Sequence, residues 1–303
     1  MYFAKPLEPL RSPSAARVRP GSRGHLHRCA LALLPLLLAP GAAGAQAVDL
    51  EALGAMQARS IGPAGMSGRV TAIDALDDDP LTLYVGAASG GVWKSTNGGD
   101  TFRPLFDDQR IANIGAIAIH PSFRDVVWVG TGEGNPRNSA DPGAGIYRSI
   151  DGGENWTFLG LEETRQIHRI LLHPTDPDVA WVGAMGPIWS AGEDRGVYRT
   201  TDGGESWEKV LYVDEDTGIS EMVQDPVNPN KIIAAMWSFR RWPWYFESGY
   251  GDGSGLYITY DGGDSWEELG PAEGIPGGKL GRMGLAISRS NPDWVYALIE
   301  AEE

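Results

Sequence analysis

The chain has 303 residues, which is enough for two ordinary domains or for one large repetitive domain. Its 11 Trp and 10 Tyr argue for a packed core and exclude a disordered chain, and its net charge of −15 disfavours nucleic acids and anionic membrane surfaces as partners. A single Cys excludes a disulfide framework and a Cys-rich metal site, while 41 Gly and 21 Pro are usual for turn-rich all-β folds.

Residues 1–45 have the composition of a secretory signal peptide. Six basic residues precede an apolar run, residues 29–40, and the small residues 43–45 that follow it form a cleavage site. The run is shorter than the roughly 20 residues that span a bilayer, and two prolines argue against a buried helix. We therefore expect cleavage near Ala45 and a secreted or periplasmic protein without membrane insertion, monomeric by charge repulsion. Residues 46–66 are expected to be a lead-in to the folded part.

A turn motif occurs four times between residues 95 and 266. Each copy has Ser or Thr, then Asn or Asp two residues later, then a Gly-Gly pair and an aromatic residue. The copies are Ser95–Phe102, Ser149–Trp156, Thr200–Trp207 and Thr259–Trp266, and we call them the repeat turns. Their third positions, Asn97, Asp151, Asp202 and Asp261, are spaced by 54, 51 and 59 residues. Four copies in register indicate a repeat architecture.

A second motif recurs at the same period, a Pro/Asp turn between two runs of apolar, β-branched and aromatic residues, as in a hairpin. The unit is therefore four short strands, in the second copy about residues 114–119, 126–130, 145–149 and 156–159. Such units, none able to bury its face alone, predict four-stranded antiparallel blades of a β-propeller with negligible helix. Four full units span about residues 68–270, and a fifth stops after its second strand. We expect about four and a half blades in residues 67–303, a fragment of a larger propeller.

The repeat turns are predicted to be structural rather than catalytic. The carboxylate accepts hydrogen bonds from turn amides, the Gly pair permits positive φ, and the aromatic residue packs beneath the turn. The aromatic residues are Phe102, Trp156, Trp207 and Trp266. Because the acids repeat once per blade, they cannot all converge on one site. His120 and His173 also lie at hairpin turns, and Asp77–Asp79 reads as a solvated turn; we predict no metal site and no cofactor.

The repeat turns are similar to the Asp-box, also called the bacterial neuraminidase repeat (BNR). On these turns, the chain resembles the secreted bacterial Asp-box propellers grouped with the amino-terminal domain of sortilin. The resemblance covers residues 57–303 and also rests on segments 59–63, 90–95, 130–135 and 195–204. It implies a propeller, ten-bladed in the animal receptors, whose Cys-rich module a mature chain without Cys lacks. Bacterial relatives of this kind are often named glycosyl hydrolases by analogy.

Two enzyme families share the Asp-box, and each implies particular residues. Sialidases carry an Arg-Ile-Pro motif, to which Arg59–Pro63 is similar except for two inserted residues. Xyloglucanases place a catalytic Asp after the second strand of the first blade, and the matching segment here, residues 88–91, has Ala88 in its place. An Ala cannot act as a general base. We identify no catalytic residue and keep glycoside hydrolysis, with catalytic groups partly outside this chain, as the alternative to binding.

Strand alternation gathers the long loops on one face. With the strands of each blade lettered A to D, the A–B and C–D turns lie on one face and the B–C and D–A loops on the other. We call these the turn face and the loop face. The long insertions are B–C loops, predicted at residues 131–144, 184–194 and 237–254, and they hold four Trp outside the repeat. Long loops on a rigid scaffold usually carry function.

The ligand site is predicted on the loop face near the propeller axis, for a peptide or carbohydrate partner. Arg and aromatic side chains together make hot spots for peptides, exposed rings stack on sugars, and adjacent arginines suit a carboxylate. The candidate residues are Glu133, Arg137, Asn138, Arg240, Arg241 and Trp242. In an enzyme, Glu133 would be the best carboxylate of these loops. Alternatively, the rings plug the gap between blades, and buried arginines would then need partners.

Overall fold

The computed structural model describes residues 69–242, 244–246 and 251–302, which all belong to the second of two units of the chain, residues 58–303. The predicted signal peptide and lead-in lie outside the described residues. The described part is all-β, and its helices are two short 3-10 turns, η1 Glu162–Thr164 and η2 Pro271–Glu273. None of its helices is long and apolar enough to cross a membrane. The predicted fold class is confirmed.

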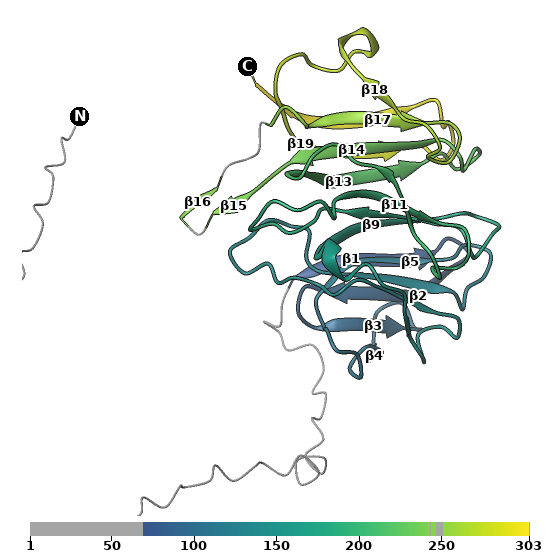
Figure 1. The fold of residues 1–303 in the computed structure, drawn as a ribbon. Helices are drawn as coiled ribbons and strands as arrows, with labels where there is room; N and C mark the ends of the chain where they lie inside the picture. Colours follow the sequence, from purple (N-terminus) through teal and green to yellow (C-terminus); the bar gives the residue numbers. More distant parts are fainter. Residues whose placement is uncertain (1–68, 243, 247–250, 303) are drawn as a thin grey trace, which may run out of the picture. The chain divides into compact units, whose positions relative to one another are not determined.

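Four antiparallel four-stranded sheets follow one another in chain order, and each is one predicted blade (Figure 1). Their A to D strands are β1 Val70–Leu76, β2 Asp79–Ala87, β3 Gly91–Ser95 and β4 Arg103–Pro104; β5 Ile114–Ile119, β6 Val127–Thr131, β7 Ile146–Ser149 and β8 Thr157–Phe158; β9 Ile167–Leu172, β10 Ala180–Ala184, β11 Gly196–Thr200 and β12 Glu208–Leu211; β13 Thr217–Gln224, β14 Ile232–Ser238, β17 Gly255–Thr259 and β18 Glu267–Leu269. A two-stranded sheet, β19 Leu280–Ile287 and β20 Val295–Ala301, provides the A and B strands of a fifth blade. This is a partial propeller of four and a half blades.

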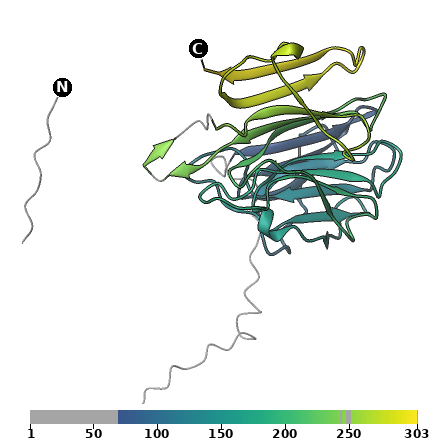
Figure 2. The same cartoon turned by 45° about the horizontal axis from the view of Figure 1, so that its top comes forward.

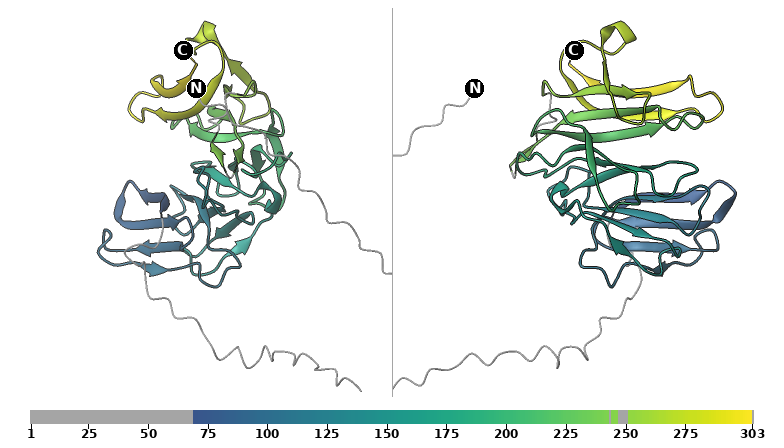
Figure 3. Two further views of the ribbon diagram at one scale, coloured as in Figure 1. Left: turned by 90° about the vertical axis from the view of Figure 1, so that its left-hand side faces the viewer. Right: turned by 45° about the vertical axis from the view of Figure 1, so that its right-hand side comes forward.

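The hydrophobic cores lie between the blades. Each inner strand packs against the inner strand of the next blade, from β1 through β5, β9 and β13 to β19 (Figure 3). Strand β5 is buried along its whole length. One core joins Tyr84 of blade 1 to Val127 and Tyr147 of blade 2, and similar cores follow between later blades. Each blade therefore needs its neighbours to bury its faces, as the repeat pattern predicts.

The repeat turns contain the predicted hydrogen bonds. In the second turn, Oδ1 of Asp151 accepts from the backbone N of Asn155 at 2.9 Å and from Oγ of Ser149 at 2.8 Å. Both glycines have positive φ, and the backbone N of Gly153 donates to Oγ of Ser149 at 2.8 Å. Equivalent bonds surround Asn97, Asp202 and Asp261.

The aromatic residue of the repeat turn lies against a glycine of its own turn, as predicted, since a Cβ added at Gly153 would be 3.3 Å from the Trp156 ring, and it also contacts the preceding blade. Nε1 of Trp156 donates to the carbonyl of Leu105 at 2.8 Å, and its ring meets Phe106 with centroids 5.2 Å apart. Both partners belong to the preceding blade. Trp207 makes the same bond to Leu159 at 2.8 Å. The ring thus fastens two blades together, because the preceding blade offers both a free carbonyl and an apolar surface.

A second contact, which we call the seam clamp, joins strands B and C of one blade to the repeat turn of the next. An aromatic residue of strand B and a cation of strand C pair across the strands, and the cation, joined in blades 1 and 3 by the aromatic residue, donates to the carbonyl of the first turn Gly. The donors and acceptors are Tyr84 and Lys94 to Gly152, Arg148 to Gly203, and Trp181 and Arg199 to Gly262, at 2.7–3.2 Å. In blade 4 the two positions hold Ile233 and Ile258, paired in the same register.

The predicted assignment of turns to faces is confirmed. On the turn face, the backbone N of Gly152 in a C–D turn donates to the carbonyl of Asp125 in the A–B turn at 2.9 Å. On the loop face, B–C loops bond to D–A loops, as where the backbone N of Phe239 donates to the carbonyl of Asp216 at 2.9 Å. The loop face is therefore one continuous surface built from both kinds of loop.

Candidate functional site

The aromatic residues of the loop face divide into a buried group and an exposed group. Trp237 and Phe239 are buried, and their ring centroids lie 4.4 Å apart. They pack in one cluster with residues from the B–C loops of blades 2 and 3, namely Ala140, Met185 and Ile188. This group does plug the space between blades. Trp237 lies within β14, so the B–C loop of blade 4 begins after Ser238 and not at Trp237.

The exposed group lies on a hairpin in the B–C loop of blade 4. Strands β15 Arg241–Trp242 and β16 Tyr245–Phe246 pair and project beyond the blade (Figures 1 and 2). Trp244 is 83% exposed and Trp242 38%, with their ring centroids 6.4 Å apart. The neighbouring B–C loop adds Trp189, 40% exposed, next to Ile188, whose carbonyl accepts from the backbone N of Arg241 at 2.6 Å. The result is a raised aromatic surface.

The predicted arginines of this loop have partners within the protein. Nε of Arg241 donates to Oδ1 of Asn138 at 3.0 Å, which joins the B–C loops of blades 2 and 4. Nη2 of Arg240 lies 3.6 Å from Oδ1 of Asp216, and its guanidinium lies 5.5 Å from the centroid of Trp242. The structure therefore brings Asn138 to Arg241 and Arg240 to Trp242.

Glu133 lies deeper than the other candidates. Its carboxylate is fully buried and accepts two hydrogen bonds from Arg69, one from Nε at 2.7 Å. The bond to Glu133 is the main reason that the pKa of Arg69 is raised. Arg69 also reaches the carbonyl of Ser139 at 3.4 Å, so it ties the blade 2 loop to the start of blade 1. Arg137, on the same loop, is exposed, and its side chain has no bonded partner among the described residues.

Sequence reasoning missed a polar group on the inner strands, which we call the axial cluster. Arg169 on β9 donates two hydrogen bonds to Glu221 on β13, one from Nη2 at 2.6 Å. Nη2 of Arg282 on β19 lies 3.2 Å from Oδ1 of Asn135 and 3.4 Å from Nε2 of His168. Burial lowers the pKa of His168 well below its usual range, so this ring is neutral at neutral pH. Blades 2 to 5 all contribute to the cluster.

A shift in strand pairing occurs at the same level of each inner strand. Such β-bulges re-aim side chains and are frequent beside functional sites. The residues at the shifts are Thr71, Gly115, His168, Ser220 and the pair Gly281 and Arg282. Oγ of Ser220, for example, reaches across to the carbonyl of Met283 at 3.1 Å. The signal in the sequence is a small or polar residue interrupting an apolar strand.

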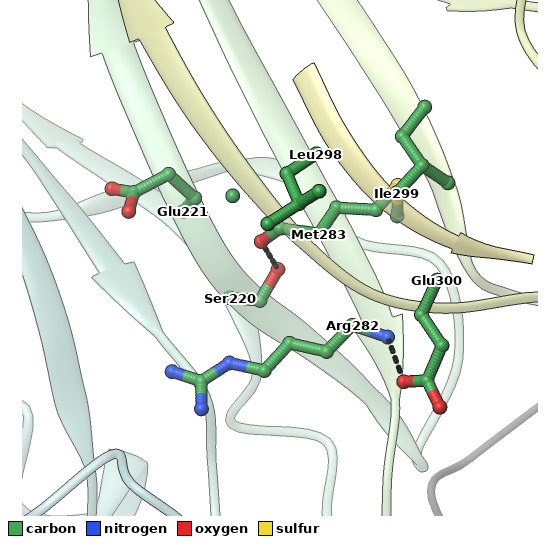
Figure 4. Close-up of a pocket in the computed structure, with 8 residues that line it drawn as sticks. Ser220, Glu221, Arg282, Met283, Leu298, Ile299 and Glu300 are labelled. Atoms are coloured by element: carbon green, nitrogen blue, oxygen red, sulfur yellow. Dashed lines mark hydrogen bonds between the residues drawn. The ribbon is translucent and has the colours of Figure 1, made fainter.

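A cavity of about 450 Å³ lies beside the axial cluster, between β13 and the β19–β20 hairpin (Figure 4). Its wall includes Ser220, Glu221, Arg282, Met283, Leu298 and Glu300. Oε2 of Glu300 accepts from the backbone N of Arg282 at 3.2 Å. Polar groups and apolar side chains thus share one cavity next to the loop face.

The Asp77–Asp79 turn has arginine partners rather than a cation-binding arrangement. Asp77 pairs with Arg289, and Oδ2 of Asp78 accepts from Arg124 at 2.5 Å. Across the part of the chain that the structure describes, no group of three or more His, Cys, Asp and Glu is placed to hold a metal ion.

The chain matches a known family over the repeat. The model of the family described as "Sortilin, neurotensin receptor 3" (Sortilin-Vps10) matches residues 90–211 and 144–274, which together cover more than half of the chain. The chain belongs to this sortilin family. The resemblance to the sortilin propeller, which the repeat turns indicated, is therefore confirmed for the family and for the propeller fold.

Other relatives of this sortilin-family chain are glycoside hydrolases. The oligoxyloglucan reducing-end-specific xyloglucanase of Emericella nidulans is 24% identical over 220 residues, covering 67% of this chain and 24% of the relative. An ancestral GH74 enzyme has 20% identity and a TM-score of 0.54, covering 77% of this chain and 30% of its own. The GH74 xyloglucanase of Xanthomonas campestris has 16% identity and a TM-score of 0.52, and the match covers 76% of this chain and 35% of the xyloglucanase chain. At these identities the solved structures show the fold alone.

The chain spans about a quarter of the length of the curated xyloglucanase and about a third of each of these two structures. Its propeller is thus glycoside hydrolase-like in fold. Ala88, at the position where the xyloglucanase motif has Asp, is buried, and its backbone N donates to the carbonyl of Arg69 at 2.9 Å.

Proposed function

We propose that the protein is an exported glycan-binding propeller whose ligand site lies on the loop face. The exposed pair Trp242 and Trp244 carries this proposal. Trp244, 83% exposed, gains little from folding because it buries little apolar area, whereas Trp242 is partly covered and packs beside Arg240. Exposed aromatic rings stack on the apolar faces of sugars, and their grouping on one hairpin suits a chain of several sugar units.

The polar candidates suit the same ligand. Arg240 and Arg241 lie beside the rings, and their pairs with Asp216 and Asn138 hold the guanidinium groups in place. Fixed donors recognise sugar hydroxyls at a lower entropic cost than mobile ones. Arg137 is exposed and directly precedes Asn138, the residue that joins the B–C loop of blade 2 to Arg241. A glycan is favoured over a peptide because the named relatives include xyloglucanases.

Export rests on the sequence of residues 1–45, with a basic stretch, an apolar run and a small-residue site. A propeller that binds polysaccharide needs to meet its ligand outside the cytoplasm. Sequencing the amino terminus of the mature protein tests this part, and a start near residue 46 is the expected result.

Binding is tested with the Trp242→Ala, Trp244→Ala double variant on immobilised plant polysaccharides. We expect the variant to lose about 2 kcal/mol or more of binding free energy while its melting temperature falls only slightly, because neither ring belongs to a core between blades. The matched control is Tyr260→Ala, which removes an aromatic residue that is 61% exposed in a repeat turn on the opposite face. Equal binding by all three proteins would contradict the proposal.

Glycoside hydrolysis remains the second candidate because of the xyloglucanase relationship. Most glycosidases need two carboxyl groups about 5–10 Å apart across the bond. Glu133, the sequence-based candidate, is bound to Arg69 on both oxygens, so catalysis would require that pair to open. Release of reducing sugar from xyloglucan by the wild type, abolished in Glu133→Gln with folding retained, would replace binding by hydrolysis as the main function.

A further inference from the structure

Arg282 is a cation without a counter-charge among the residues that the structure describes. No described carboxylate lies within ion-pair distance of its guanidinium. The nearest candidate, Glu221, is engaged on both oxygens by Arg169. Glu300 contacts the backbone N of Arg282 and not its side chain. Glu221 therefore acts on Arg282 only at a distance, and no described carboxylate forms an ion pair with its guanidinium.

The other neighbours of Arg282 supply no negative charge either. Nη2 contacts two neutral acceptors, Oδ1 of Asn135 and Nε2 of His168. An arginine that donates to Nε2 of a neutral imidazole requires the proton on Nδ1, and this buried atom also lacks a partner among the described residues. The guanidinium carbon lies 5.6 Å from the ring centroid of Trp237. The cluster thus has more donors than acceptors.

The position of Arg282 makes this imbalance costly. Burial lowers the pKa of Arg282, the neighbouring charge of Arg169 lowers it further, and the charge of Glu221 only partly opposes these two effects. A partly desolvated cation without a counter-charge costs free energy, which an anion with matching geometry would recover. Nε and Nη1 of Arg282 have no described partner and are not among the buried unsatisfied atoms, so they are accessible for such a ligand.

The adjoining cavity fits a sugar ring better than a small inorganic anion. Its volume of about 450 Å³ falls within the usual range of ligand pockets, about 300–1,000 Å³. Leu298 and Met283 offer an apolar wall, as Figure 4 shows, and Glu300 and Glu221 offer carboxylate acceptors for hydroxyl groups. Those same carboxylates repel a dianion such as phosphate more strongly than a single carboxylate, whose one charge the guanidinium can offset.

We propose that this cavity binds an acidic sugar, with the carboxylate of a uronic acid unit paired to Arg282 and its hydroxyls bonded to Glu221 and Glu300. Guanidinium and carboxylate form bidentate, charge-assisted hydrogen bonds. The inference rests on the proposed glycan-binding function and names the ligand class. It departs from the named relatives, whose xyloglucan substrate carries no such charge.

The test compares two soluble probes that differ in one charged unit, xylotriose and xylotriose bearing a glucuronic acid branch, by calorimetric titration of the full-length protein. We expect the acidic probe to bind at least about tenfold more tightly than the neutral one. Arg282→Gln should abolish that preference, and Arg282→Lys should keep part of it. The control is Arg289→Gln, an exposed arginine near the end of the same hairpin strand, which should leave the preference unchanged.

Thermal melting of each variant separates ligand loss from unfolding, and Arg282→Lys keeps the charge if Arg282→Gln fails to fold. Equal binding of the two probes, or a preference that survives in Arg282→Gln, would overturn the acidic-sugar assignment alone. Absence of any glycan binding, with Trp242 and Trp244 intact, would overturn the proposed function as well. An unrelated peptide that displaces the acidic probe through its free carboxyl terminus would reassign the cavity to a peptide ligand.

Discussion

At the scale of single residues, the acids of the repeat turns act as acceptors in fixed networks. Oδ2 of Asp202 accepts from Oγ of Ser206 at 2.5 Å, and Oδ1 accepts from the hydroxyl of Thr200 and the backbone N of Ser206. These bonds, led by the one from Ser206, hold the pKa of Asp202 at about 2, below its usual 3.8. Asn155 has the same effect on Asp151, and Ser265 on Asp261.

This geometry predicts a loss of stability in acid. Because the folded-state pKa of Asp202 is depressed, its contribution is fully present above the unfolded value near 3.8 and disappears as the pH falls toward about 2. We expect the melting temperature of the wild type to fall between pH 4.5 and pH 2. Asp202→Asn, which imitates the natural Asn97 of the first turn, should fall less over this window. Parallel curves for the two proteins would contradict the prediction.

At the scale of elements, the seam clamp explains why each blade adheres to the next. Arg148 is 15% exposed and donates to the carbonyls of Gly203 at 3.2 Å and Pro177 at 3.0 Å, and to Asp178 at 2.9 Å. Its guanidinium also lies 5.2 Å from the ring centroid of Trp128. One side chain thus holds two turns of the next blade.

Replacing Arg148 with Met should destabilise the protein by about 1–3 kcal/mol, because two carbonyls lose a charged donor in a half-buried place. The matched control is Arg124→Met, whose partner Asp78 is 68% exposed. Such an exposed pair contributes about 0–1 kcal/mol. Urea denaturation measures both, and equal effects of the two substitutions would show that the clamp adds nothing to blade adhesion.

The sequence predicted the four-stranded blades and the assignment of turns and loops to two faces because turn chemistry is local. Gly-Gly pairs, Asp acceptors and Pro turns act within a few residues. It missed partners that meet only through the fold, such as Arg69 with Glu133, 64 residues apart, and Arg282 with Asn135, 147 residues apart. It placed Trp156 against its own turn but missed the bond to Leu105, because that carbonyl becomes available only once two blades pack. Of the loop aromatics, only the structure separates buried Trp237 from exposed Trp244.

At the scale of the whole described propeller, stability passes from blade to blade through the shared cores, as in other repeat proteins. Strand β10 is buried throughout and paired on both edges. Strand β20 pairs only with β19 among the described strands, and Tyr296 and Leu298 along it are 61% and 82% exposed, as is Trp294 just before it, at 60%. Local stability therefore falls from the middle blades toward the fifth.

Hydrogen exchange of this 303-residue chain should follow the same order. We expect the amides of Val295–Ala301 to exchange at least about a hundredfold faster than those of Ala180–Ala184, because opening the hairpin exposes far less buried surface. Mass spectrometry of peptic fragments resolves the two segments. Similar protection in both would mean that the five units unfold as one.

The two isoleucines of blade 4, Ile233 and Ile258, have a mechanical consequence. Where earlier blades are keyed to the next turn by directed hydrogen bonds, this fourth junction offers a smooth apolar sheet toward its rim. Near the axis, Oγ of Ser220 donates to the carbonyl of Met283 at 3.1 Å, and on the loop face Nζ of Lys279 lies 3.8 Å from Oδ1 of Asp252. Apolar contact has no preferred direction, so the outer part of this junction fixes the fifth unit less closely than the hydrogen-bonded clamps fix the earlier blades. The cavity beside Arg282 lies at this junction, so its width depends on a contact that few directed bonds hold in place.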